Sequence, residues 1–259
     1  MLATERGLPV GDPGERGAGS GKRQYVRDMF TAIAPRYDFL NHLLSLNIDR
    51  RWRRTAVAML DWQRAPSGRF LDCCAGTLDL AATLGNAPGF TGQVIGADFV
   101  LPMLVRGAGK SARVLPVTAD ALELPFADSN FEGATVGFGV RNLSDLDAGL
   151  RELYRILKPG ARLVILEFTT PRWQPMRAGY FMYFRHILPL IGRLVSKHTT
   201  AYTYLPESVL NFPEPDALAA RMTSAGFKDV TYRRLTGGIC AVHSGRRSTV
   251  DSRPSGGLS

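Results

Sequence analysis

The stretch Phe70-Leu-Asp-Cys-Cys-Ala-Gly-Thr-Leu-Asp-Leu-Ala81 decides the fold of this chain. An apolar run that ends in an acid, a turn of small residues and a helical pattern predict a strand, a tight loop and a helix. A second apolar run, Val94-Ile-Gly-Ala-Asp98, also ends in a carboxylate. This layout is typical of a nucleotide-type pocket at the carboxyl ends of parallel strands, where Asp98 can accept hydrogen bonds from both hydroxyls of a ribose.

The composition of the turn excludes a P-loop and is poorly suited to a dinucleotide. No Gly-Lys-Ser/Thr follows it, which excludes a P-loop, and the spacing of a G-x-G-x-x-G dinucleotide fingerprint is absent. Only Gly76 occupies the tight part of the loop. A nucleoside without a pyrophosphate fits better, so we expect S-adenosylmethionine. We expect Thr77 to cap the following helix or to contact the methionine part of this ligand.

Beyond this unit, apolar runs and helical patterns alternate, which predicts a parallel sheet covered on both faces. Two late runs are joined only by Thr236-Gly-Gly238, and so short a link makes them antiparallel. The predicted fold class is therefore α/β: a Rossmann-like, mostly parallel seven-stranded sheet with an antiparallel C-terminal strand and helices on both faces. We expect strands near 69–73, 93–98, 113–118, 132–138, 162–168, 227–233 and 238–243, and helices near 77–86, 101–108 and 145–158, the last stopped by Lys158-Pro159-Gly160.

Length and composition indicate one domain with additions. The 259 residues carry a formal net charge of +9 and three cysteines, which we interpret as small buried residues in a reducing cytosol. No apolar run is long enough to span a bilayer, so we expect a cytoplasmic protein, peripheral at most at the inner face of the cell membrane. The expected organisation is a disordered leader over 1–24, a domain over 25–245 with an insertion over 170–212 that covers the active site, and a disordered tail over 246–259.

Several segments outside the turn carry a family resemblance. Ala119–Phe126, Phe131–Asn142 and Leu150–Phe168 closely resemble the ubiquinone and menaquinone biosynthesis C-methyltransferases, which are class I S-adenosylmethionine-dependent enzymes. The resemblance covers about residues 25–245. It extends to Tyr37-Asp-Phe-Leu-Asn-His-Leu-Leu-Ser45 with Trp52, to Tyr202-x-Tyr204-Leu-x-Glu-Ser208 and to Leu235-Thr-Gly-Gly238.

The resemblance implies C-methylation of a demethylmenaquinol to a menaquinol, with S-adenosylmethionine as methyl donor and no metal. Two alternatives stay open: methylation of a benzoquinol or another prenylated phenol, and a non-catalytic protein that binds S-adenosylmethionine. The implied partners are a prenylated hydroquinone, an anionic membrane surface through Arg50–Arg54 and the apolar block 180–191, and a second copy of the chain. Nucleic acid is not an expected partner.

The expected site combines position and resemblance. Asp120 and Ala121, at the end of the third strand, are expected to contact the adenine edge. Arg141 is expected to stabilise a phenolate, the alternative being a surface arginine paired with Asp145 or Asp147. The catalytic candidates are Arg141, Asn142 and Tyr37, with Tyr202 as a further ring contact, and the cofactor-binding candidates are Gly76, Thr77, Asp98, Asp120, Ala121 and Gly137.

Two departures from the family pattern bear on the site. Leu78 stands where glycine is usual, at a position expected in the first helical turn, where the residue serves helix–strand packing more than close approach of the cofactor. We expect leucine to be tolerated there if the helix shifts outward slightly, with weaker or altered cofactor binding at most. Asp49 stands where histidine is usual, so substrate contacts differ if that histidine touches substrate in relatives. A smaller change is Gly137, where many relatives have serine.

Overall fold

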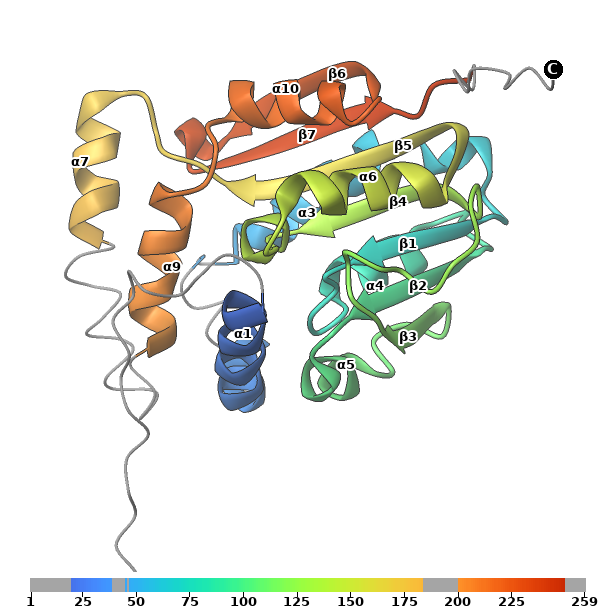
Figure 1. The fold of residues 1–259 in the computed structure, drawn as a ribbon, viewed down its shortest axis with the longest axis horizontal. Coiled ribbons are helices and arrows are strands. Elements are labelled where there is room, and N and C mark those ends of the chain that lie inside the picture. The colour runs from blue at the N-terminus through green and yellow to red at the C-terminus, as the bar shows by residue number, and fades with distance from the viewer. Residues whose placement is uncertain (1–19, 39–44, 46, 184–199, 250–259) are drawn as a thin grey trace, which may run out of the picture.

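A seven-stranded sheet organises the chain, and its strand order is β3-β2-β1-β4-β5-β7-β6 (Figure 1). The computed structural model describes residues 20–38, 45, 47–183 and 200–249. β1 to β5 pair in parallel, whereas β7 lies antiparallel to both β5 and β6, which confirms the predicted fold class. The strands are β1 (Arg69–Cys73), β2 (Gln93–Asp98), β3 (Val114–Thr118), β4 (Phe131–Gly137), β5 (Leu157–Phe168), β6 (Lys228–Leu235) and β7 (Cys240–Arg246).

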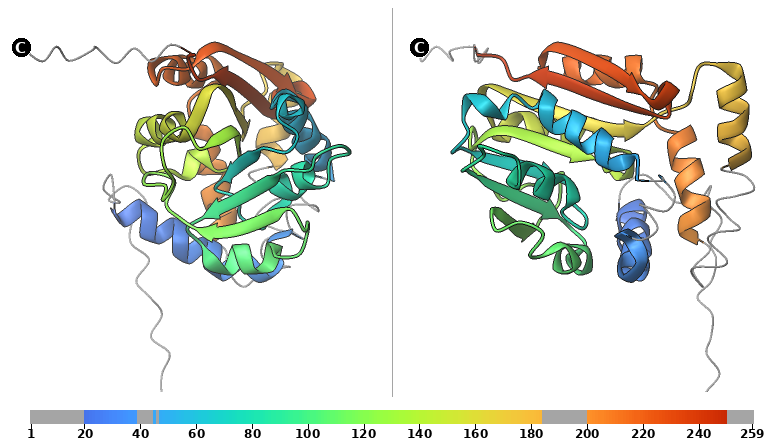
Figure 2. Two further views of the ribbon diagram at one scale, coloured as in Figure 1. Left: turned by 90° about the vertical axis from the view of Figure 1, so that its right-hand side faces the viewer. Right: turned by 180° about the vertical axis from the view of Figure 1, so that it is seen from behind.

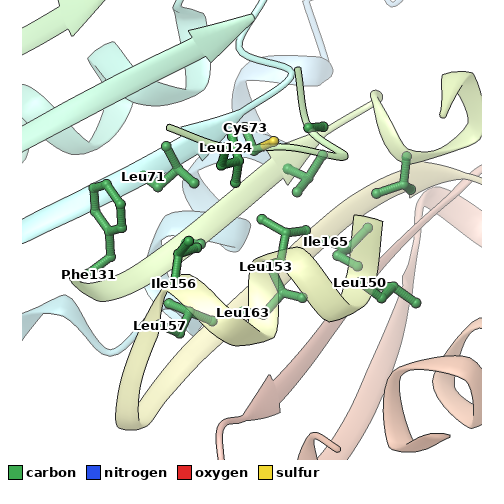
Figure 3. Close-up of a cluster of buried hydrophobic side chains, with 14 of the residues drawn as sticks. Leu71, Cys73, Leu124, Phe131, Leu150, Leu153, Ile156, Leu157, Leu163 and Ile165 are labelled. Carbon is green, nitrogen blue, oxygen red and sulfur yellow. The ribbon is translucent and has the colours of Figure 1, made fainter. Parts of the chain in front are cut away.

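Helices cover both faces of the sheet (Figure 2). On one face, α3 (Asp49–Met59), α4 (Asp79–Gly85) and α5 (Leu101–Gly107) bury apolar side chains against the strands. On the other, α6 (Leu146–Ile156) and α10 (Pro215–Ser224) do the same. Figure 3 shows the second cluster, in which three α6 side chains face β1 and β5: Leu150, Leu153 and Ile156, each at most 1% exposed. Burial of such side chains on both faces is the main stabilising term of the layered fold.

Three further helices lie beyond the carboxyl ends of the parallel strands: α1 (Ser20–Ile33), α7 (Gln174–Met182) and α9 (Thr200–Leu210) (Figures 1 and 2). α1 ends before Pro35, which lies in the short helix η2 (Ala34–Arg36). In the described part of the chain, no helix has the length and apolar character needed to cross a membrane.

The structure corrects three sequence-based boundaries. α1 begins at Ser20, so residues 20–24 are helical and do not belong to the leader. The helix expected to reach 158 ends at Ile156, because Leu157 already pairs with Phe131 in the sheet. Lys158-Pro159-Gly160 therefore lies within β5, where Gly160 adopts a left-handed φ of +79°.

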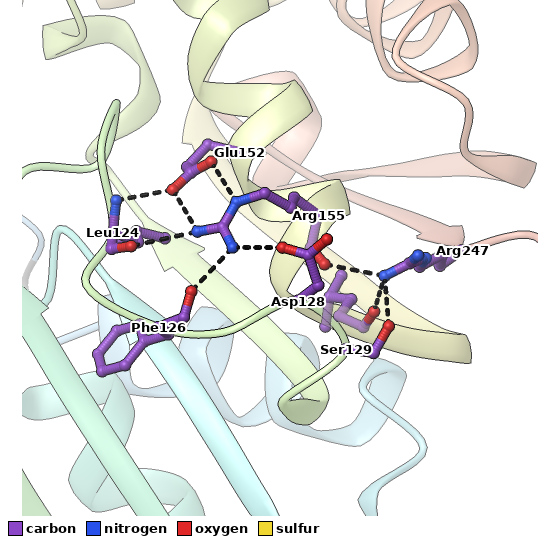
Figure 4. A network of polar contacts seen from close by, with 8 residues as sticks. Leu124, Phe126, Asp128, Ser129, Glu152, Arg155 and Arg247 are labelled. Atoms are coloured by element: carbon purple, nitrogen blue, oxygen red, sulfur yellow. Dashed lines mark hydrogen bonds and ion pairs between the residues drawn. The ribbon is translucent and has the colours of Figure 1, made fainter. Parts of the chain in front are cut away.

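The tail also begins later than residue 246. β7 extends to Arg246, and the next residue, Arg247, is only 6% exposed. Figure 4 shows the reason: the Arg247 guanidinium donates to the Ser129 hydroxyl at 3.0 Å and to the Arg155 carbonyl at 2.9 Å. A buried arginine is tolerated when its donors find acceptors. Residues 1–19, 184–199 and 250–259, which include most of the expected leader, tail and 180–191 block, lie outside the described residues.

Candidate active site

The turn between β1 and α4 is held by Asp98 at the end of β2. Cys74, Gly76 and Leu78 have left-handed φ values of +55°, +51° and +63°. The Gly76 amide donates to Asp98 Oδ2 at 2.8 Å, and the Val100 amide donates to Asp98 Oδ1 at 2.8 Å. Because each carboxylate oxygen has two lone-pair directions, Asp98 keeps acceptor capacity for two ribose hydroxyls.

Asp98 is 8% exposed, and its surroundings affect its charge. Burial raises the pKa of its carboxyl above the usual range, while the amide hydrogen bonds from Val100 and Gly76 oppose this shift. The two amides thus stabilise the ionised carboxylate of Asp98, although this carboxylate is largely shielded from water.

A pocket opens at this edge of the sheet and encloses about 740 Å³, including its open mouth. It brings together most residues that the sequence predicted for the site. Those lining it are Tyr37, Gly76, Asp98, Asp120, Ala121, Gly137 and Asn142.

The walls of the pocket fit an adenosyl group. Phe99, Val100, Met103 and Leu122 supply apolar surface around the Asp98 carboxylate, the mixture expected where a nucleoside binds. The floor depends on Gly139, since a Cβ atom there would lie 2.3 Å from Cys74 Cβ. Among the described residues, no three His, Cys, Asp or Glu side chains gather in a way that could hold a metal ion.

Asp120 also lines the pocket, but it is ion-paired with Arg23 of α1. Its Oδ1 accepts a hydrogen bond from the Leu122 amide at 2.9 Å, which shapes the turn after β3. An adenine amino group at Asp120 would therefore share the carboxylate with Arg23.

The prediction that Thr77 caps α4 is wrong. Leu78 occupies the N-cap of α4 and its side chain makes no cap hydrogen bond; the first-turn amide of Ala81 donates instead to Asp72 Oδ2 at 2.9 Å. Thr77 is 2% exposed and donates to Asp38 Oδ1 at 2.5 Å, outside the set of residues that line the pocket. Its hydroxyl thus ties the segment around Tyr37 to the cofactor turn, and a contact with the methionine moiety stays a prediction.

Arg141 is buried in an ion pair. It lies in the short helix η4 (Val140–Asn142) after β4, and its side chain is 7% exposed. Its Nη1 donates to Glu167 Oε1 at 2.6 Å and to the Phe138 carbonyl at 2.5 Å. Its guanidinium carbon lies 5.6 Å from the centre of the Phe168 ring. No acceptor from the described residues lies within hydrogen-bond distance of its Nε.

The alternative surface pairing of Arg141 is wrong. Asp145 caps α6 by accepting from the Ala148 amide at 2.9 Å, and Asp147 pairs with Arg221 at 2.8 Å. Asp145 and Asp147 therefore make contacts at the start of α6, and these contacts do not involve Arg141.

Asn142 links this loop to α9. The Tyr204 hydroxyl donates to Asn142 Oδ1 at 3.0 Å, and the Tyr204 ring lies 5.7 Å from that of Tyr25. Sequence reasoning quoted Tyr204 within a motif but gave it no role, and it missed Glu167. The signal for Glu167 was its position: like Asp98, it is an acid at the carboxyl end of a parallel strand. Tyr202 belongs to α9, but its side chain lies outside what the structure describes.

The two family departures face away from the pocket. Leu78 is 2% exposed and fits against Gly96 and Gly107, where added Cβ atoms would lie 2.3 and 2.9 Å from its side chain. Leu78 thus packs as expected, although it is the N-cap of α4 and does not lie in the first helical turn. Its effect on cofactor binding stays a prediction. Asp49 is 3% exposed, pairs with Arg53 at 2.7 Å and accepts from the Ser45 hydroxyl at 2.6 Å. Asp49 is thus part of a buried polar cluster and does not line the pocket.

Comparison with known proteins identifies the family. Residues 19–247 match the model of the ubiE/COQ5 methyltransferase family. The chain belongs to this family. Among its relatives is a demethylmenaquinone methyltransferase of Thermus thermophilus, 50% identical over 85% of this chain and 100% of the relative. The ubiquinone/menaquinone biosynthesis C-methyltransferase UbiE of Geotalea daltonii is 44% identical over 87% of this chain and 97% of the relative.

Solved structures with the same fold are more distant in sequence. The [4+2]-cyclase SpnF aligns with a TM-score of 0.65 at 16% identity, covering 88% of this chain and 97% of its own. An S-adenosylmethionine-dependent methyltransferase of Thermotoga maritima aligns with a TM-score of 0.59 at 19% identity, covering 85% and 99%. These likenesses support the class I methyltransferase fold, and membership in the ubiE/COQ5 family implies use of S-adenosylmethionine.

Proposed function

We propose that this protein transfers a methyl group from S-adenosylmethionine to a ring carbon of a demethylmenaquinol, giving a menaquinol for respiratory electron transport. One observation carries the proposal. The Asp98 pocket is bordered by the same short loop that holds the buried Arg141 and its neighbour Asn142. Relatives from Thermus thermophilus and Deinococcus radiodurans are named demethylmenaquinone methyltransferases, the second 44% identical over 94% of this chain.

The donor side is assigned to the pocket residues. Asp98 would accept from the ribose hydroxyls, Asp120 and Ala121 would contact the adenine edge, and Gly76 and Gly137, which line the same pocket, would lie beside the bound cofactor. S-adenosylmethionine, when bound, supplies a methyl group made electrophilic by its sulfonium. The protein therefore has no donor to activate, and its residues act by holding two partners in line.

The substrate ring that accepts the methyl group needs a protein group that donates hydrogen bonds to it. A hydroquinone ring carbon becomes nucleophilic as the neighbouring hydroxyl gives its proton to a water and negative charge develops on the oxygen. The bond from this carbon to the methyl group forms as the methyl–sulfur bond breaks and S-adenosylhomocysteine leaves. The ring carbon then loses its hydrogen as a proton to solvent, which restores the aromatic ring. Arg141 does not itself line the pocket, but its guanidinium is a planar set of donors whose Nε–H has no acceptor among the described residues, and we place it beside the acceptor ring, where it would stabilise the negative charge that develops on the oxygen. Tyr37 and Asn142, which line the pocket, would orient the ring.

Turnover on a defined substrate tests the proposal. Purified protein is incubated with S-adenosylmethionine and a short-chain demethylmenaquinol, and the methylated product is measured by mass spectrometry beside a demethylated benzoquinol. We expect methylation of the naphthoquinol ring. Preference for the benzoquinol would favour the ubiquinone alternative, and S-adenosylmethionine binding without turnover on either ring would favour a non-catalytic role.

We also propose contact with an anionic membrane surface, where a prenylated substrate resides. The basic run near the start of α3 supplies less charge than expected, since Arg53 is buried and paired with Asp49 and Asp79. α7 and the residue before it add exposed apolar side chains: Trp173 and Met182 are 68% and 57% exposed. Cosedimentation with anionic vesicles that fades as salt rises would support this contact, and equal binding to neutral vesicles would contradict it.

A further inference from the structure

Glu167 is a buried acid beside the candidate site. It lies near the end of β5, 1% exposed, and its carboxylate accepts from Arg141 Nη1 at 2.6 Å. The same carboxylate accepts from the Phe168 amide at 2.9 Å and from the Arg141 amide at 3.5 Å. Glu167 thus contacts both the backbone and the side chain of Arg141.

The loop that Glu167 holds is strained. Phe138 has a left-handed φ of +58°, although it has a bulky side chain. Its amide donates to the Leu166 carbonyl at 2.8 Å, and its carbonyl accepts from Arg141 Nη1. Its ring lies 4.5 Å from that of Phe168 and 6.2 Å from that of Trp52. Strained backbone persists where several contacts hold it, and such places cluster at functional sites.

We propose that Glu167 is a positioning residue for methyl transfer, which holds Arg141 and the Phe138–Asn142 loop so that the guanidinium and the Asn142 amide face the acceptor ring. The inference rests on the proposed function for the identity of that ring. Glu167 itself does not line the donor pocket and acts through Arg141.

Stability alone does not account for this pair. Burial of two charges has a desolvation cost that often cancels their attraction, and packed apolar residues would serve the core as well. Burial raises the pKa of Glu167, and the neighbouring charge of Arg141 opposes this shift. An ion pair kept at such a cost beside a strained loop is better explained by the geometry it imposes.

The chain offers a matched control in the Glu152–Arg155 pair of α6 (Figure 4). Arg155 donates to Glu152 through Nη2 at 2.7 Å and through Nε at 2.8 Å, in a pair that is more exposed than that of Arg141 and Glu167. Neither Glu152 nor Arg155 lines the donor pocket. Glu152→Gln therefore removes the charge of an arginine-bound glutamate without touching the loop after β4.

The first experiment compares Glu167→Gln, Glu167→Asp and Glu152→Gln by steady-state kinetics on short-chain demethylmenaquinol, at a temperature where circular dichroism shows all of them folded. For Glu167→Gln we expect kcat to fall about 100-fold, as a small displacement of catalytic groups does. The KM for the quinol and the Kd for S-adenosylhomocysteine should change less than about threefold, since uniform binding is kept. Glu167→Asp, which keeps the charge, should recover part of the loss, and Glu152→Gln should match the wild type.

A second measurement does not depend on turnover. Hydrogen exchange on the S-adenosylhomocysteine complex should show faster exchange of the Asn142 and Leu143 amides in Glu167→Gln, with β4 and α6 unchanged. These amides donate to the Gly139 and Val140 carbonyls within the held loop. Unchanged exchange, a kcat within threefold of wild type, or a loss that falls on S-adenosylhomocysteine affinity would overturn the proposal. Absence of wild-type turnover would instead overturn the proposed function.

Discussion

At the scale of single residues, Asp98 has two tasks. It holds the turn through the Gly76 and Val100 amides, and it is placed to accept from a ribose. We expect Asp98→Ala to abolish S-adenosylmethionine binding in calorimetry, since two hydrogen bonds to a charged acceptor contribute about 3–6 kcal/mol. Circular dichroism should show a folded protein with a lowered melting temperature. Affinity equal to wild type would contradict the pocket assignment.

Leu78 combines a buried side chain with a backbone conformation that favours glycine. Leu78→Ala should lose about 2–5 kcal/mol of unfolding free energy because a cavity replaces the side chain. Leu78→Gly loses the same contacts but relieves the left-handed strain, so it should be about 1 kcal/mol more stable than Leu78→Ala. Urea unfolding measures both. A more stable alanine variant, or a tenfold gain in S-adenosylmethionine affinity for Leu78→Gly, would show that Leu78 acts differently.

At the scale of elements, α1 bridges the loops that follow three strands. Lys22 donates to the Arg141 and Leu143 carbonyls at 3.2 and 2.6 Å, beyond β4. Arg23 pairs with Asp120, beyond β3, and Arg27 donates to the Phe99 carbonyl at 3.5 Å, beyond β2. One helix thus extends across the mouth of the donor pocket.

This arrangement predicts that α1 slows the escape of the bound nucleoside. The double variant Lys22→Met/Arg23→Ala should release S-adenosylhomocysteine on the order of tenfold faster, because two backbone hydrogen bonds and a partly exposed ion pair are lost. Stopped-flow displacement measures the rate. Arg51→Ala, an exposed change on α3, serves as the control. Identical rates in both variants would mean that α1 is not a barrier.

At the scale of the whole molecule, two buried groups couple stability to pH in opposite directions. Burial raises the pKa of Asp72 to about 7, although Thr135 and the Ala81 amide donate to it. Burial lowers the pKa of His243 to about 4, where its Nε2 meets the Pro215 carbonyl at 3.0 Å. Between about pH 4 and 7 the folded state keeps a proton on Asp72 that the unfolded state has lost. Between about pH 4 and 6.5 His243 binds a proton in the unfolded state but not in the folded state.

The two effects can be separated by substitution. The Asp72 contribution falls as pH rises from about 4 to 7, so Asp72→Asn should gain stability over wild type across that range, by on the order of 4 kcal/mol at pH 8. The His243 contribution falls as pH drops below 6.5, so His243→Gln should gain relative to wild type toward pH 4, by on the order of 3 kcal/mol. Denaturant unfolding at several pH values measures both differences, and parallel curves for wild type and variants would contradict the assignments.

The sequence by itself determined the periodic features of this protein. Strand and helix patterns depend on local spacing, so the elements and the antiparallel end of the sheet could be predicted. The pocket residues Gly76, Asp98, Asp120 and Asn142 followed for a related reason. Parallel strands place their carboxyl ends at one edge, and acids at those ends meet there whatever the rest of the chain does.

Only the tertiary structure decided the partners of individual polar side chains. Arg141 pairs with Glu167 from the neighbouring strand and not with the nearby Asp145, and Thr77 donates to Asp38 and caps no helix. Arg247, assigned to the tail by composition, is buried against carbonyl groups. A hydrogen bond forms where packing brings a donor within about 3 Å of an acceptor. The packing of the helices on the sheet sets this distance, and the spacing of residues along the sequence does not reveal it.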